Sequence, residues 1–361
     1  MLARRHSYPA VRATTATPLH RDDLMRQAAI ARELGSPFVG QVLEAARRQL
    51  DHAPRLAERI DFWPGDFAAD AVAMRLNAGL NALARRDAPP VLGRLYRERA
   101  GNFDSAIAAA LALGEDELVE WLDWPTQTNE VGRSSAFIAA LAVLAARDPR
   151  PVELLEIGAS AGLNLNLARY GHVLGGQTLG DAGSRLVIRP DWQGPPPPAA
   201  PVLIQEARGV DLRPIDLADP AARERMMAFV WADRDDRAAR LAGAFAVAAV
   251  HPPRVEQGSA LEWLPAQLAR PQDAGTRRVI ANSMVTQYFS PEQRRGMIAS
   301  VLQAGARATA ERPLAWISLE WTRDRSEVQL RLTEWNGQGG EGVTTTLATC
   351  HPYGASVTWK A

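Results

Sequence analysis

The chain has 361 residues, of which 47% are hydrophobic and 23% are charged, values typical of an ordinary globular protein. At about 100–200 residues per domain, this length predicts two domains, or one large domain with an extension. Basic and acidic residues both number 41, so the formal net charge is zero. Zero net charge excludes the long-range electrostatic footprint of a nucleic-acid-binding protein or a basic membrane-surface protein. We therefore expect a small-molecule substrate, with neither nucleic acid nor a membrane as a partner.

The cysteine and histidine content predicts the compartment and disfavours a metal site. Cys350 is the single cysteine, so we expect no internal disulfide and no thiolate metal cluster. The six scattered histidines show no paired ligand spacing, which argues against a bound metal. No apolar segment typical of a signal peptide follows Arg4 and Arg5. These patterns predict a cytoplasmic protein.

The sequence pattern of the first third of the chain predicts helices. Residues 1–18 are polar and punctuated by proline, which is typical of a disordered tail. Residues 19–125 predict a helical N-terminal region, because apolar side chains recur there at three- and four-residue spacing. Helices are expected at Leu24–Leu34, Phe38–Leu50, Phe67–Leu83, Asp104–Leu113 and Glu115–Leu122.

Residues 126–361 alternate between strand-like and helical patterns. After a helix at Ser134–Ala146, the apolar run Val152–Ile157 predicts a strand, and an amphipathic helix at Leu163–Tyr170 follows at once. The Gly- and Pro-rich segment Leu179–Pro201 predicts an inserted loop or hairpin. The last fifty residues read as a meander of strands. The fold class predicted is α/β, a doubly wound sheet with antiparallel C-terminal strands, preceded by the α-helical N-terminal region.

The turn after the strand Val152–Ile157 reads Glu-Ile-Gly-Ala-Ser-Ala-Gly, at a junction where α/β folds bind ligands. In a nucleotide-binding loop, Gly158 would allow the tight turn and Gly162 would open the helix, so that bare amides face the ligand. The spacing Gly-x-x-x-Gly lacks the middle glycine that close approach to a pyrophosphate needs. S-adenosylmethionine has no phosphate, and Glu156 can order the loop and face the cationic amino-acid part of that ligand.

Two alternatives remain for the same turn. It is a literal Gly-x-Ser-x-Gly match, which would make Ser160 the nucleophile of a serine hydrolase, with His251 or His351 as the base. The helical character of nearly everything before the turn disfavours that fold, and an anionic Glu156 would be unfavourable beside a developing oxyanion. A turn of small residues without any ligand is the other alternative.

Longer stretches of the sequence resemble a known family. They are two signatures, the first at Gln127–Arg133 and the second at Leu154–Leu165, with supporting stretches at Arg208–Asp216 and His351–Gly354. The sequence resembles an uncharacterised bacterial domain-of-unknown-function family over nearly the whole chain after the tail. That family is grouped by resemblance with class I S-adenosylmethionine-dependent methyltransferases and brings no established reaction. The resemblance therefore implies a Rossmann-like, methyltransferase-type sheet.

The methyltransferase resemblance implies S-adenosylmethionine as cofactor, bound at the strand ends. The first-strand residues implied to hold it are Glu156, Gly158, Ala159, Ser160 and Gly162. Asp211, at the end of the second strand, would accept hydrogen bonds from both ribose hydroxyls, or would merely cap the following turn. Ser259 follows the third strand, where the layout often has an acid near adenine. Asn282 ends the fourth strand and would face the transferred methyl, or would serve as a turn residue.

The first signature supplies candidate catalytic residues. Asn129, Glu130 and Arg133 would bind or orient a polar acceptor, and Glu130 would also act as a base. The alternative is a helix N-terminus in which Glu130 favours the dipole and Arg133 is its partner. Asn164 is either a capping residue or a ligand contact. The leading hypothesis is methyl transfer to a small polar acceptor, and a non-catalytic binding protein on the same fold is the main alternative.

Overall fold

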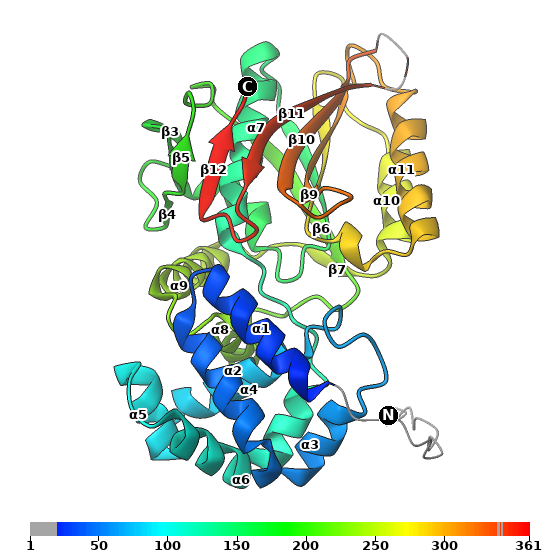
Figure 1. Cartoon of the computed structure of the whole chain (residues 1–361). Helices are drawn as coiled ribbons and strands as arrows, with labels where there is room; N and C mark the ends of the chain where they lie inside the picture. Colours follow the sequence, from blue (N-terminus) through cyan, green and yellow to red (C-terminus); the bar gives the residue numbers. More distant parts are fainter. Residues whose placement is uncertain (1–19, 338–339, 341) are drawn as a thin grey trace. The chain divides into compact units, whose positions relative to one another are not determined.

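The computed structural model describes residues 20–337, 340 and 342–361, so the tail expected over residues 1–18 lies outside the described residues. The described chain divides into two compact units (Figure 1). The N-terminal unit contains the residues up to Thr126 together with Trp231–Asp233, and the C-terminal unit contains residues 127–230 and 234–361. Within the described part of the chain, no helix is long and apolar enough to cross a bilayer.

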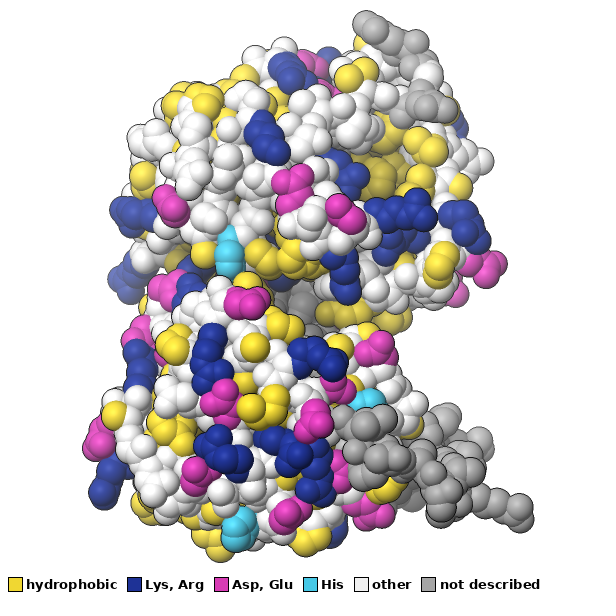
Figure 2. Space-filling view, in the orientation of Figure 1, with side chains coloured by type: hydrophobic (Ala, Val, Ile, Leu, Met, Phe, Trp, Pro, Cys, Tyr) yellow, Lys and Arg dark blue, Asp and Glu magenta, His cyan; other side chains and the backbone are white. Residues whose placement is uncertain are grey.

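The N-terminal unit is helical. Its helices are α1 (Arg21–Glu33), α2 (Pro37–Gln49), α3 (Pro54–Asp61), α4 (Val72–Arg85), α5 (Pro90–Glu98) and α6 (Phe103–Trp121), with a 3-10 turn η1 (Leu50–His52). Helices α2, α3 and α5 begin with proline, whose fixed φ and missing N–H suit the first helical position. Charges of both signs are interspersed on the face shown in Figure 2, and arginine–acid pairs such as Arg32–Glu44 account for part of this mixing.

Helix α6 corrects one prediction from the sequence. Two helices, Asp104–Leu113 and Glu115–Leu122, were expected, but the helix runs unbroken through Gly114. A Cβ atom at Gly114 would lie 2.7 Å from Cδ1 of Leu83 in α4. The glycine therefore allows two helices to pack closely, and that packing offsets the cost of about 1 kcal/mol that glycine carries inside a helix.

The C-terminal unit is built on a mixed sheet. Its described residues form nine strands in the order β5-β12-β11-β10-β9-β8-β1-β6-β7. The bounds are β1 Val152–Ile157, β5 Asp191–Gln193, β6 Ile204–Asp211, β7 Val255–Gln257, β8 Arg277–Ser283, β9 Leu314–Trp321, β10 Val328–Trp335, β11 Val343–Cys350 and β12 Ser356–Trp359. Strands β7, β6, β1, β8 and β9 are parallel. The strands from β9 to β12 are antiparallel, as the sequence predicts.

Helix α7 (Ser134–Arg147) covers one face of this sheet, and α10 (Ala260–Ala269) and α11 (Pro291–Gly305) cover the other (Figure 1). The unit also contains α8 (Pro220–Phe229), α9 (Asp235–Val250) and the 3-10 turns η2 (Val131–Arg133), η3 (Leu163–Arg169) and η4 (Thr286–Tyr288). Leu154 of β1 packs in one core with Phe137 of α7, whereas Leu155 packs in another with Leu264 and Val301 of α10 and α11. Strand β1 is therefore buried on both faces, which explains its near-continuous apolar run.

The order of the parallel strands marks one position at the sheet edge. Counted along the chain, these five strands lie in the spatial order 3-2-1-4-5, because the chain leaves β1 towards β6 and β7 and returns to β8 on the other side of β1. Open α/β sheets bind ligands at the carboxyl ends of the strands where the order reverses. That position lies at the ends of β1 and β8.

The Gly- and Pro-rich insertion contains short strands. Strands β2 (Gly171–Leu174), β3 (Gln177–Gly180) and β4 (Val187–Ile188) form a separate small sheet. Its hairpin turns at Gly175 and Gly176, which both have positive φ. Strand β5, from the same insertion, joins the main sheet beside β12. The hairpin turn precedes the predicted segment Leu179–Pro201, which supplies only the end of β3 and otherwise forms a loop with the two short strands β4 and β5, paired in parallel with β2 and β12.

Arg278 of β8 joins the sheet to α10. It is 5% exposed, pairs with Glu153 at 2.9 Å, and donates to carbonyl oxygens at and just beyond the C-terminal end of α10. Arg278→Lys keeps the charge but loses the planar five-donor fork. We expect the free energy of unfolding to fall by about 1 to 2 kcal/mol in urea denaturation, with no change in the exposed control Arg295→Lys. Equal denaturation midpoints for Arg278→Lys and wild type would contradict the anchoring role.

Candidate functional site

Polar side chains gather at the carboxyl ends of the parallel strands. Glu156 is the penultimate residue of β1 and Asp211 is the last residue of β6. Asn282 is the penultimate residue of β8, and Glu320 holds the same place in β9. Because neighbouring parallel strands end on the same edge, these side chains converge there. Three of them were predicted from the sequence, and Glu320 was not.

Glu156 is a buried acid with an unsatisfied oxygen. The residue is 2% exposed, and its Oε1 accepts a long hydrogen bond of 3.5 Å from Nδ2 of Asn164. Its Oε2 has no hydrogen-bond partner among the described residues. Burial raises the pKa of Glu156 to about 8, with a further raising effect from the charge of Asp211. The carboxyl is therefore mainly protonated at pH 7, and a bound cation would favour its ionised form.

The loop after β1 uses left-handed backbone conformations at Gly158, Ser160 and Gly162, with φ values of +68°, +55° and +72°. Glycine adopts this conformation readily, whereas a residue with a side chain is strained there. Such strain concentrates at functional sites. The Oγ of Ser160 is buried without a hydrogen-bond partner in the described chain. Ser160 is therefore a candidate ligand contact, as the sequence predicts.

The amides of this loop are used by the protein itself, contrary to the expectation that they face a ligand. The amides of Gly158 and Ala159 donate to the carbonyl oxygen of Val210 at 2.9 and 3.1 Å. The amide of Ser160 donates to Oδ2 of Asp211 at 2.9 Å, and that of Gly162 donates to the Ala159 carbonyl oxygen. Strand β6 satisfies the first three of these donors because it lies directly beside the turn, and the four bonded amides form no cradle for an anion.

The glycines and Ala159 pack against protein atoms. A Cβ atom at Gly158 would lie 2.5 Å from Cγ2 of Val285, and one at Gly162 would lie 2.6 Å from Pro253. Ala159 is fully buried, in close contact with Gly209 of β6. These residues shape the turn, and the unsatisfied polar atoms near it come from side chains instead.

Asp211 closes the same loop. Its Oδ2 accepts from the Ser160 amide and its Oδ1 accepts from the Arg213 amide, both at 2.9 Å. Asp211 therefore caps the turn, which was the predicted alternative to a contact with the ribose hydroxyls. Each carboxylate oxygen retains a second lone pair, so the contact with ribose hydroxyls stays a prediction.

Asn129 links the first signature to the loop. Its backbone is left-handed, with φ of +37°, and its Oδ1 accepts from the Leu163 amide at 2.9 Å. That amide starts η3, a 3-10 helix where the sequence predicted an amphipathic α-helix. The prediction is wrong because Asn164 and Asn166 are buried like the leucines between them, so the segment has no solvent face that would impose α-helical periodicity.

Glu130 pairs with arginines of α9. Its Oε2 accepts from Nε of Arg237 at 2.8 Å, and its Oε1 lies 3.6 Å from Nη1 of Arg240. Arg237 also stacks on the ring of Tyr353, 4.1 Å from its centroid. Glu130 caps η2, since its Oε1 accepts from the Gly132 amide at 3.2 Å, but its ion-pair partner is Arg237 and not Arg133 as the capping alternative proposed. Both oxygens of Glu130 face protein donors, an arrangement that suits a positioning residue better than a base.

Arg133 meets a turn near the C-terminus. Its Nε donates to the carbonyl oxygen of Pro352 at 2.9 Å, across a sequence separation of 219 residues. A Cβ atom at Gly354, where φ is +66°, would lie 2.4 Å from the carbonyl carbon of Gly132. The stretches Gln127–Arg133 and His351–Gly354, both singled out in the sequence, thus form one packed unit.

Residues 21–359 match the model of the family described as "Uncharacterized protein conserved in bacteria (DUF2332)". The chain belongs to this family. The match spans both signatures and confirms the family resemblance of the sequence. No curated protein and no solved structure matches the chain. The family description names no reaction.

Asn282 is held by β9. Its Nδ2 donates to Oε1 of Glu320 at 2.7 Å, and its Oδ1 accepts from Nε1 of Trp316 at 2.6 Å. The same Glu320 oxygen accepts from the amides of Val285 and Thr286. These bonds fix the loop after β8 beside the β1 loop. The contact of Asn282 with a transferred methyl stays a prediction.

Glu320 was missed because it belongs to no motif. The only sequence signal was an acid at the end of an otherwise apolar strand, the pattern that also singled out Glu156. Ser259, by contrast, was singled out and caps α10, where its Oγ accepts from the Leu261 amide at 3.3 Å. This is the ordinary role of serine at a helix start.

The serine hydrolase alternative gains no support from the geometry. Ser160 Oγ bonds to no residue of the described chain. His351 Nδ1 instead accepts from the Tyr353 amide at 3.1 Å, and His251 ends α9. A general base must lie within hydrogen-bond reach of the nucleophile, and neither proposed histidine is bonded to Ser160.

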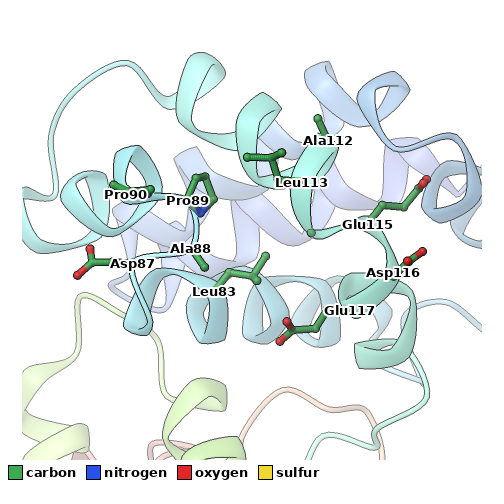
Figure 3. A pocket seen from close by; sticks show the side chains of 11 residues that line it. Leu83, Asp87, Ala88, Pro89, Pro90, Ala112, Leu113, Glu115, Asp116 and Glu117 are labelled. Carbon is green, nitrogen blue, oxygen red and sulfur yellow. The ribbon is translucent and has the colours of Figure 1, made fainter.

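The described residues of the N-terminal unit contain an open groove of about 580 Å³ between the α4–α5 connection and α6 (Figure 3). Three of its acids pair with arginines, as Asp87–Arg97, Asp116–Arg55 and Glu117–Arg86. None of the residues proposed from the sequence lines the groove. Among the described residues, no cluster of three His, Cys, Asp or Glu side chains is arranged to hold a metal ion.

Proposed function

We propose that the C-terminal unit binds S-adenosylmethionine at the carboxyl ends of β1 and β6 and transfers its methyl group to a small polar acceptor. The observation that carries the proposal is Glu156, a buried acid with an unpartnered oxygen. Ser160 Oγ and Asn164 Oδ1, close by in the same segment, are buried and unpartnered within the described chain as well. Buried polar atoms are nearly always paired, so a ligand that donates hydrogen bonds there accounts for all three.

The residues fit several parts of this ligand. Its ammonium group offers three donors and a positive charge, which suit the acceptor oxygens of Glu156 and Asn164. Because the amides of Gly158, Ala159, Ser160 and Gly162 are already bonded, the β1 loop suits a ligand without a phosphate. Asp211 retains lone pairs for hydroxyl donors, and Leu212, which is 71% exposed, offers apolar surface to a flat ring.

The strand order supports a methyltransferase-type, Rossmann-like sheet. The parallel strands follow the order 3-2-1-4-5, which is shared by doubly wound nucleotide-binding sheets. Acids stand at the ends of the first two of these strands, as Glu156 and Asp211. This arrangement places the proposed cofactor residues at the edge where such sheets bind ligands.

The chemistry required of the chain is modest. When bound, S-adenosylmethionine supplies a methyl group already activated by its sulfonium. Glu156 and Asp211 would anchor the ligand, and Glu320 would hold the loop after β8 against the site. Arg133 would orient the acceptor, with Glu130 and Asn129 keeping its segment in place. Alignment of two reactants can by itself supply much of the rate enhancement.

Calorimetry with S-adenosylmethionine and S-adenosylhomocysteine tests this proposal. We expect both to bind and to stabilise the protein by roughly 2.7 kcal/mol at a hundredfold excess over Kd. Because a bound ammonium favours ionised Glu156, whose pKa is about 8 in the free protein, binding at pH 7 should release nearly one proton. Titrations in two buffers of different ionisation enthalpy measure that release.

The outcomes separate the hypotheses. Asp211→Ala should weaken binding, because it frees the Ser160 amide and removes the proposed hydroxyl acceptor. If the folded protein binds neither ligand, the proposal is wrong. Tight binding without methyl transfer to any of a broad set of small acceptors would instead favour a non-catalytic binding protein.

A further inference from the structure

Arg133 carries donor groups that the protein does not use. Its Nε bonds to Pro352, but neither Nη1 nor Nη2 has a hydrogen bond, or a carboxylate within 4.0 Å, in the described chain. The side chain is only partly exposed. Nearby Arg237 and Arg240, by contrast, both lie against Glu130. A partly buried guanidinium without a counter-ion is costly unless a ligand compensates it.

The position of Arg133 is rigid. Its backbone lies where η2 runs into α7, against Gly354, whose Cβ would come within 2.8 Å of the Arg133 amide nitrogen. The bond from Nε to Pro352 fixes the other end of the side chain. Two donor groups of the guanidinium are therefore left free on a side chain that is already ordered. Such preorganisation reduces the entropy lost on binding.

The surroundings of Arg133 are positively charged. The charged residues around the His351–Gly354 turn are Arg133, Arg234, Arg237, Arg240, Glu130 and Asp236. With Glu320, whose charge also acts on Arg133, four cations face three anions in a chain whose net charge is zero. His351 adds no charge at neutral pH, because burial and the neighbouring arginines lower its pKa. Glu320 acts on Arg133 electrostatically but is bonded to backbone amides.

Arg133 also lies within electrostatic reach of the strand-end site. Its charge lowers the pKa of Glu156, against the larger raising effect of burial. No ion pair joins the two side chains among the described residues, since Glu156 Oε2 is unpartnered. The site therefore holds an unsatisfied acceptor and an unsatisfied cation near one another. This combination matches a ligand that carries both a donor group and an anion.

We infer that Arg133 is an anion-recognition residue that binds a carboxylate of the ligand at the strand ends. The inference rests on the proposed function for the location of its ligand. The free edge of the guanidinium, formed by Nη1 and Nη2, matches the two oxygens of a carboxylate, and a bound anion would balance the excess positive charge. The carboxylate belongs either to the amino-acid part of S-adenosylmethionine or to an acidic methyl acceptor.

Isothermal titration of the full-length protein separates these two sources. The ligands are S-adenosylhomocysteine, its decarboxylated analogue and 5′-methylthioadenosine. The variants are Arg133→Gln, Arg133→Lys and the exposed control Arg295→Gln. If the nucleoside supplies the carboxylate, wild type should prefer S-adenosylhomocysteine to the decarboxylated analogue about tenfold to a hundredfold. Arg133→Gln should lose that preference, Arg133→Lys should keep part of it, and Arg295→Gln should keep all of it.

If the acceptor supplies the carboxylate, the preference is absent in wild type. L-methionine and succinate, added with saturating S-adenosylhomocysteine, should then raise the unfolding temperature of wild type but not of Arg133→Gln. Circular dichroism and the ligand-free unfolding temperature verify that each variant is folded. The inference is overturned if Arg133→Gln responds to all of these compounds as wild type does. That result would not contradict the proposed S-adenosylmethionine site.

Failure of the proposed function gives a different pattern. In that case no nucleoside binds wild type, and L-methionine and succinate alone decide whether Arg133 recognises anions. Stabilisation of wild type that is lost in Arg133→Gln supports the inference without the cofactor. No stabilisation by either compound overturns it.

Discussion

Replacing Glu156 by Gln should stabilise the free protein at pH 8 and abolish its binding of S-adenosylmethionine. Burial raises the pKa of Glu156 from its ordinary value of 4.5 to about 8. The folded state therefore keeps a proton that the unfolded chain releases between these two values. Stability is complete below pH 4.5 and is lost as the pH rises to 8, by about 1.4 kcal/mol for each pKa unit. The total loss is on the order of 4 to 5 kcal/mol.

Urea denaturation at pH 5 and pH 8 measures this effect. Glutamine has almost the same shape and no charge, so the variant should show little of the decline between these pH values that wild type shows. Glu311→Gln, at an exposed position, should behave as wild type. A variant that is more stable and yet fails to bind separates a loss of function from a loss of folding. Parallel pH profiles in the variant and wild type would contradict the assignment of the titrating group.

Gly354→Ala should destabilise the protein by about 3 kcal/mol or more and weaken ligand binding. Its φ of +66° costs a residue with a side chain about 1 to 2 kcal/mol. The added methyl group would also lie 2.4 to 2.8 Å from backbone atoms of Gly132 and Arg133, which cannot rotate away as a side chain can. The clash can be relieved only if Gln127–Arg133 moves away from His351–Gly354. That movement lowers the free energy of unfolding further, by an amount similar to that seen for overpacked cores, and it displaces Arg133.

Gly275→Ala is the matched control for this prediction. Gly275 has a similar φ of +81° but no atom within 4 Å of the position that a Cβ would take. Gly275→Ala should therefore lower the free energy of unfolding only through its positive φ, by about 1 to 2 kcal/mol. Urea denaturation of the two variants measures the difference, which is the contribution of the packing against Gly132. If both variants lose the same stability, the close contact of the two stretches is not important for folding.

Local patterns predicted much of the sheet and the position of its ligand-binding edge. The run Val152–Ile157 is readable because β1 is apolar on both faces, which also makes Glu156 conspicuous within it. The ends of two further strands, near Asp211 and Asn282, were expected from the methyltransferase resemblance, and β6 and β8 end there. The helix expected at Leu163–Tyr170 failed because burial on all sides removes the periodicity that such predictions use.

The partners of the polar side chains could not be predicted in the same way. Arg133 and Pro352 meet across 219 residues, and Glu320 bonds to Asn282 because β8 and β9 are adjacent in register. Glu130 is paired with Arg237 rather than with Arg133, which is nearer in sequence. Contacts of this kind depend on strand order and register, and no short window of sequence contains that information.

The sequence by itself determined the family, the mixed α/β class with its helical N-terminal region, and the edge of the sheet where polar residues collect. These features depend on composition, periodicity and motifs, which are properties of neighbouring residues. Only the tertiary structure decided which polar groups of that edge are already bonded within the protein and which are left for a ligand. It showed that β6 satisfies the amides of Gly158, Ala159 and Ser160, whereas the side chains of Glu156, Ser160 and Arg133 retain unpartnered atoms in the described chain. The physical reason is that hydrogen-bond satisfaction depends on which strands lie side by side, and the fold alone sets that order.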